Sequence, residues 1–137
     1  MRKINKIIIH CSESDNPEHD DIEVIRKWHT SPSPYDPSKP WSDVGYHYFI
    51  QKDGTIQKGR DEDIVGAHCF GENQNSIGIC LHGIDLFSEM QFRHLNNLIC
   101  DISGRHGIKE IGGHYQYDDR KTCPNFDIPE FLKNYDL

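Results

Sequence analysis

Two histidines and one cysteine, far apart along the chain, have the residue types and surroundings of metal ligands. His10 ends an apolar run of three isoleucines (7–9), where a rigid strand would hold its ring in place. His114 and Cys123 lie at the two ends of a polar loop that can fold back and bring both side chains to one point. Three such ligands leave one tetrahedral position for water, which is typical of a catalytic rather than a structural zinc site.

The residues around this loop favour the same interpretation. Two glycines precede His114 and allow the backbone to turn into it. Pro124 biases Cys123 toward an extended conformation, in which Lys121 and Cys123 project to the same side. A lysine in that position would direct its ammonium group into the cavity that holds the metal.

Each motif alone also has an ordinary explanation, and other kinds of site remain open. A lone histidine is more often a hydrogen-bonded core or surface residue, and a tyrosine-rich strand such as the one around Tyr46 usually serves packing. A cysteine hydrolase would use Cys123 or Cys11 as its nucleophile, but Pro124 after Cys123 offers no N–H to an oxyanion. A structural zinc domain would need a fourth protein ligand.

The bulk composition limits the classes of function. With 137 residues the chain has the length of one domain, for which we expect a monomer. A formal charge of −7 argues against nucleic acid and anionic membranes as partners. Five cysteines without a CxxC pair do not form a disulfide framework. With no signal peptide and no membrane-spanning stretch in the sequence, we expect a protein made in the cytoplasm, without membrane insertion.

The elements that must position these residues alternate between strands and helices. Apolar or β-branched runs predict strands at residues 6–12, 44–52, 55–58, 76–81 and 109–111. Helical spacing and capping residues predict helices at 20–30 and 88–106 and after Asp127, the first capped by Asp20 and Glu23. The proline-rich stretch 31–40 predicts an irregular loop. We therefore expect an α/β fold with a mixed central sheet flanked by helices.

Taken together, these motifs resemble the N-acetylmuramoyl-L-alanine amidases, the family that includes amidase-type phage lysozymes and peptidoglycan recognition proteins. The resemblance spans nearly the whole chain, in the family's order, at residues 8–12, 44–50, 53–55, 59–60, 65–68, 75–79 and 121–124. It implies that residues 1–137 form a single amidase domain with a metal site in a surface groove.

The resemblance also implies the reaction. One Zn²⁺ ion bound by His10, His114 and Cys123 would activate water to cleave the amide between N-acetylmuramic acid and L-alanine of peptidoglycan or muropeptides. The enzyme would be a phage or prophage endolysin that reaches the cell wall through a membrane pore, or an amidase that acts on wall fragments. The alternative is a non-catalytic peptidoglycan-binding receptor, and the complete ligand set argues against it.

Further residues receive roles from the same resemblance. Tyr46 and Lys121 are the implied catalytic partners, and which of them transfers the proton is left open. His68 and Asn75 lie in segments expected to contact the substrate. The proline-rich loop 31–40 is longer than the connection typical of compact phage enzymes, so it is expected to form a wall of the groove.

Overall fold

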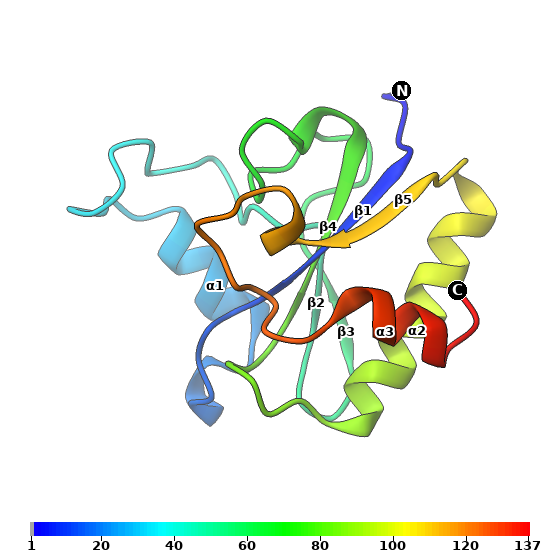
Figure 1. The fold of residues 1–137 in the computed structure, drawn as a ribbon. Coiled ribbons are helices and arrows are strands. Elements are labelled where there is room, and N and C mark those ends of the chain that lie inside the picture. Colours follow the sequence, from blue (N-terminus) through cyan, green and yellow to red (C-terminus); the bar gives the residue numbers. More distant parts are fainter. Residues whose placement is uncertain (1) are drawn as a thin grey trace.

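A five-stranded sheet lies at the centre of the protein, in the strand order β3-β2-β4-β1-β5 (Figure 1). Its strands are β1 (Lys6–Cys11), β2 (Tyr48–Ile50), β3 (Ile56–Lys58), β4 (Ser76–Leu81) and β5 (Glu110–Gly113). β1 pairs in parallel with β4 and β5, β2 pairs in parallel with β4, and β3 runs antiparallel to β2. The computed structural model describes residues 2–137, and the mixed sheet predicted from the sequence is confirmed.

Helices cover both faces of this sheet. α1 (Ile22–His29) packs on one face, and α2 (Glu89–Arg105) and α3 (Ile128–Asn134) pack on the other (Figure 1). α2 follows the predicted capping box of Ser88 and Gln91, and α3 follows an Asp127 cap with proline in its first turn. Short 3₁₀ helices lie in the connections: η1 (Pro17–His19), η2 (Asn73–Asn75) and η3 (His114–Gln116). Among residues 2–137, no helix is both long and apolar enough to span a membrane.

The predicted cap of the first helix is wrong by one residue. The Asp21 carboxylate accepts a hydrogen bond from the Glu23 N–H at 2.9 Å, which makes Asp21 the N-cap. The Asp20 carboxylate instead accepts from the backbone N–H of Lys52 at 3.2 Å. A contact distant in sequence therefore takes Asp20 away from the helix and ties the start of α1 to the turn after β2.

The predicted strand at 44–52 is also longer than the observed β2. Before Tyr48 the chain pairs with an irregular segment, and the Arg60 N–H donates to the Tyr46 carbonyl at 3.0 Å. The His47 N–H still donates to the Gly78 carbonyl at 2.9 Å, so this segment stays beside β4. The irregular backbone brings the loop after β3 close to Tyr46.

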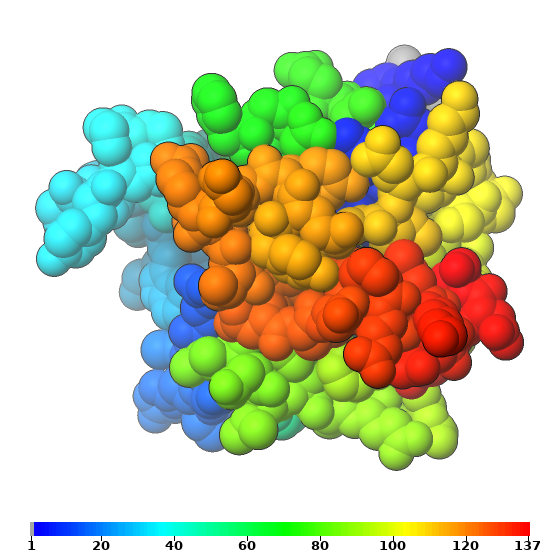
Figure 2. Space-filling model, viewed as in Figure 1, coloured from blue at the N-terminus to red at the C-terminus, as the bar shows by residue number. Residues whose placement is uncertain are grey.

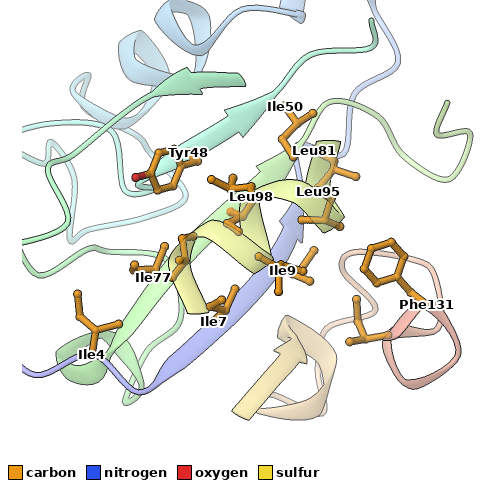
Figure 3. Close-up of a cluster of buried hydrophobic side chains, with 14 residues drawn as sticks. Ile4, Ile7, Ile9, Tyr48, Ile50, Ile77, Leu81, Leu95, Leu98 and Phe131 are labelled. Carbon is orange, nitrogen blue, oxygen red and sulfur yellow. The ribbon is translucent and has the colours of Figure 1, made fainter. Parts of the chain in front are cut away.

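Side-chain alternation along β1 divides its residues between the two faces of the sheet. Ile7 and Ile9 point toward α2 and join the main apolar cluster with Leu95 and Phe131 (Figure 3). All three isoleucines of the predicted run are fully buried, which confirms a strand covered on both faces. Because successive side chains alternate, His10 lies on the opposite face from Ile9, toward α1.

Candidate active site

His10, His114 and Cys123 come together at one edge of the sheet. His10 is near the end of β1, and His114 directly follows β5, the parallel neighbour of β1. Parallel neighbours end at the same edge, so the two histidines meet although they are 104 residues apart. Their Nδ1 atoms are 3.2 Å apart, and the ligand atoms of all three residues lie within 4.8 Å of one another.

The loop between β5 and α3 carries Cys123 back to the end of β1. The Tyr115 N–H donates to the Cys123 carbonyl at 3.0 Å, and the Cys11 N–H donates to the Cys123 sulfur at 3.1 Å. Contact with the Cys11 thiol, together with burial, raises the pKa of the Cys123 thiol. Cys123 is therefore a thiol whose proton must leave when the sulfur binds a cation.

The two glycines before His114, which the sequence suggested would allow the backbone to turn, serve close packing in the structure. Gly113 has an ordinary φ of −92°. A Cβ atom at Gly112 would lie 2.8 Å from the Tyr117 ring, and one at Gly113 would lie 2.8 Å from Cδ of Pro124. A side chain at Gly113 would collide with the Pro124 ring, and one at Gly112 would displace the Tyr117 ring, so the glycines let the loop lie directly against β5 and bring its far end back to His114.

Burial favours the neutral form of both imidazoles. It lowers the pKa of His10 well below its ordinary value, and the neighbouring His68, His114 and Lys121 lower this pKa further. Burial, followed by the Lys121 ammonium group, also lowers the pKa of His114. A neutral imidazole has a lone pair on one ring nitrogen, which is the form that binds a metal ion.

Tyr46 packs against this cluster from the segment that precedes β2. The centroid of its ring is 5.1 Å from that of His10. The preceding Gly45 makes this position possible, since a Cβ atom there would lie 2.1 Å from the carbonyl oxygen of Ala67. Burial, with the neighbouring cysteine thiols, raises the pKa of the Tyr46 phenol, so its hydroxyl keeps its proton at neutral pH.

An open cavity of about 700 Å³ adjoins the cluster. The proline-rich loop 31–40 contributes one part of its lining and extends away from the body of the molecule beyond α1 (cyan in Figures 1 and 2). The lining includes Tyr35, Asp36, Ser38, Trp41, His68, Phe70, Asn73, His114, Arg120 and Lys121. Because His114 and Lys121 are part of it, a molecule held in this cavity would lie beside the cluster.

Several residues of this cavity were not identified from the sequence. Tyr35 is 94% exposed and Phe70 is 95% exposed, so both rings are almost entirely accessible to a ligand. Arg120 also lines the cavity, where its guanidinium group pairs with the Asp118 carboxylate at 3.0 Å. These residues lie outside regular strands and helices, so periodicity gave no signal for them.

Of the two predicted substrate-binding residues, His68 lines the cavity and Asn75 does not. His68 lines the cavity but is only 8% exposed, and its Nδ1 lies 2.8 Å from Nε2 of His10. Asn75 ends η2, where its carbonyl accepts from the Asn5 N–H at 3.0 Å, whereas Asn73 of the same turn lines the cavity. Contact of His68 and Asn75 with a substrate stays a prediction.

Known proteins are similar to this chain in sequence and in fold. The Amidase_2 family, described as N-acetylmuramoyl-L-alanine amidase, matches residues 1–126. The endolysin of Enterobacteria phage K11 is 33% identical, over 99% of this chain and 90% of its own length. The solved structure of the endolysin N-acetylmuramoyl-L-alanine amidase LysCS from Clostridium intestinale URNW is 27% identical, with a TM-score of 0.85. That match covers 99% of this chain and 86% of LysCS.

A third relative extends the comparison to the recognition proteins. A Drosophila PGRP-LB mutant, solved in complex with tracheal cytotoxin, is 26% identical with a TM-score of 0.74. The match covers 90% of this chain and 76% of PGRP-LB. By the extent of its sequence match and by its fold, this chain belongs to the N-acetylmuramoyl-L-alanine amidase family.

Proposed function

We propose that this chain is an endolysin-type amidase that uses one zinc ion to hydrolyse the amide between N-acetylmuramic acid and L-alanine of peptidoglycan. The convergence of His10, His114 and Cys123 carries the proposal. The phage K11 endolysin, matched over nearly the full length of both chains, supports the endolysin role and action at the cell wall after release through a membrane pore. The PGRP-LB complex with tracheal cytotoxin, a muropeptide, supports the substrate class.

The three side chains fit zinc in number, type and spacing. Bond lengths of about 2.0 Å to nitrogen and 2.3 Å to sulfur separate tetrahedral ligand atoms by roughly 3.3–3.6 Å. The Nδ1 atoms of His10 and His114 are 3.2 Å apart, and small side-chain rotations would bring the sulfur of Cys123 into the same range. A thiolate selects zinc over magnesium or calcium. Zinc, when bound, supplies a Lewis acid that lowers the pKa of water and polarises a carbonyl group.

The chain's own side chains complete the chemistry around the scissile amide. Lys121 lines the cavity together with His114, and its ammonium group would stabilise negative charge on the carbonyl oxygen. Tyr46, whose ring packs against that of His10, would orient the attacking water through its hydroxyl and assist proton transfer to the leaving L-alanine nitrogen. The neutral imidazoles avoid adding positive charge that would repel the cation.

Removing the metal tests this proposal directly. The purified protein is expected to release peptides that begin with a free L-alanine amino group from peptidoglycan sacculi. A chelator should abolish this release, and one equivalent of Zn²⁺ should restore it where Mg²⁺ does not. Binding to sacculi without release after zinc loading would identify a receptor-type module instead. Chelator-resistant release that ends on thiol alkylation would identify a cysteine hydrolase.

The exposed aromatic residues of the cavity are proposed to hold the substrate beyond the scissile bond. The flat rings of Tyr35 and Phe70 offer apolar faces to a sugar ring or a stem peptide. Replacing both with alanine is expected to raise KM for sacculi roughly tenfold, which corresponds to about 1.4 kcal/mol of binding free energy. The kcat value should change little, because neither ring belongs to the cluster.

A matched control uses another exposed apolar residue. Leu86 is 70% exposed and does not contribute to this cavity, so Leu86→Ala should leave KM unchanged. Equal KM values for the double variant and the unmodified protein would show that Tyr35 and Phe70 do not contact the substrate. Testing soluble muropeptides beside sacculi would also separate a wall-degrading role from the processing of wall fragments.

A further inference from the structure

A chain of hydrogen-bonded side chains runs from His10 into the interior. Nε2 of His10 lies 2.8 Å from Nδ1 of His68, and Nε2 of His68 lies 3.2 Å from the hydroxyl oxygen of Ser76. The Ser76 hydroxyl donates to the carbonyl oxygen of Glu72 at 2.7 Å. His10, His68 and Ser76 are 1%, 8% and 0% exposed, so water hardly competes for these bonds.

The last hydrogen bond of this series, from Ser76 to Glu72, fixes which atom donates in each of the others. The Glu72 carbonyl only accepts, so the single hydroxyl hydrogen of Ser76 points toward it. Ser76 must then accept from Nε2–H of His68, which leaves Nδ1 of the neutral His68 ring as an acceptor. His10 in turn donates through Nε2–H and keeps the lone pair of its Nδ1 on the side that faces His114. Burial, the main cause of a strongly lowered His68 pKa, supports the neutral ring.

The backbone around His68 is built to hold its ring in one place. A Cβ atom at Gly78 would lie 2.6 Å from Cγ of His68, and one at Gly66 would lie 2.8 Å from its Cδ2. Only glycine leaves room for the imidazole at these two positions. The Asn73 side-chain oxygen also accepts from the His68 N–H at 3.0 Å. Both the ring and the backbone of His68 are therefore fixed before any ligand arrives.

We propose that His68 is a positioning residue, which sets the tautomer and the orientation of His10 so that Nδ1 of His10 binds the zinc ion. This role differs from the substrate contact expected from the sequence, and it rests on the proposed zinc site. Outer hydrogen bonds of this kind orient metal-binding histidines and raise metal affinity. Ser76 acts on His10 only through its hydrogen bond to His68. No substrate reaches Ser76, because its side chain is completely buried.

Zinc affinity of the metal-free protein, measured by competition with a chromophoric chelator, tests this role without relying on activity. His68→Leu removes the acceptor and is expected to weaken zinc binding roughly 10- to 100-fold. His68→Asn keeps an oxygen near the position of Nδ1 and should recover most of the loss. Ser76→Ala should weaken binding in the same direction and add little in the His68→Leu background, because the two residues act in series.

The controls separate positioning from substrate contact and from misfolding. His82→Leu removes another buried imidazole outside this hydrogen-bonded chain and should leave zinc affinity unchanged. The absorbance spectrum of the Co²⁺-substituted protein should shift in His68→Leu but not in His82→Leu. If His68→Leu fails to fold, the zinc affinity of Ser76→Ala still tests the proposal. Unchanged zinc affinity in His68→Leu and Ser76→Ala overturns the proposal, and a raised KM would then make His68 a substrate contact. A wild-type protein that binds no zinc would contradict the proposed zinc site instead.

Discussion

Replacing Cys123 with serine is expected to reduce peptidoglycan hydrolysis by about 10³-fold or more, because the proposed zinc ion would contribute several kcal/mol of transition-state stabilisation. Serine keeps its proton at neutral pH and is a poor substitute for a soft thiolate. Two imidazoles alone would hold zinc weakly. Zinc affinity of the metal-free variant and the rate of L-alanyl peptide release measure the two parts of this effect.

Controls for this variant separate loss of the ligand from loss of the fold. Cys100 is exposed on α2, so Cys100→Ser should keep both zinc and activity. The N–H of Cys11 that contacts Cys123 belongs to the backbone and is retained in Cys123→Ser. The metal-free variant should therefore unfold at nearly the wild-type temperature and still bind muropeptides in the cavity. Full zinc binding with lost activity would instead favour Cys123 as a nucleophile.

Much of the fold could be predicted because local patterns and tertiary contacts agree. The isoleucine run at 7–9 is fully buried in β1, and the Ser88 capping box begins α2 as predicted. The errors arose where a distant partner overrides the local signal. The backbone N–H of Lys52 donates to the Asp20 carboxylate, so Asp21 caps the helix in place of Asp20.

In the candidate site, too, the features set by local sequence patterns could be predicted, and those set by distant contacts could not. His10 could be identified because its strand ends at a defined edge, and His114 follows the neighbouring strand. The bond between His10 and His68 could not be predicted, because it depends on the space that Gly78 leaves on β4. The exposure of Tyr35 likewise depends on a loop whose conformation has no periodic signal.

Replacing Lys121 with methionine is expected to lower kcat by about 10²–10³-fold, the usual effect of losing one donor to a developing oxyanion. Methionine is unbranched and keeps most of the apolar stem of the lysine side chain, but it lacks the ammonium group and its charge. Zinc affinity should stay equal or increase, because the Lys121 charge that acts on His10 and His114 would also repel a cation between them. Steady-state kinetics on soluble muropeptides and chelator competition measure both quantities.

Lys121→Met is expected to lower kcat without lowering zinc affinity, whereas Cys123→Ser is expected to lower both. The pair of variants therefore separates the role of Lys121 from that of a metal ligand. A lysine that only supported the loop would lower zinc affinity together with activity, because Cys123 is two residues away in that loop. A lysine that only attracted substrate would raise KM and leave kcat unchanged. Lys133→Met on α3 removes an equal charge away from the cavity and should alter neither value. A lower kcat with zinc retained therefore requires the Lys121 ammonium group to act on the transition state itself.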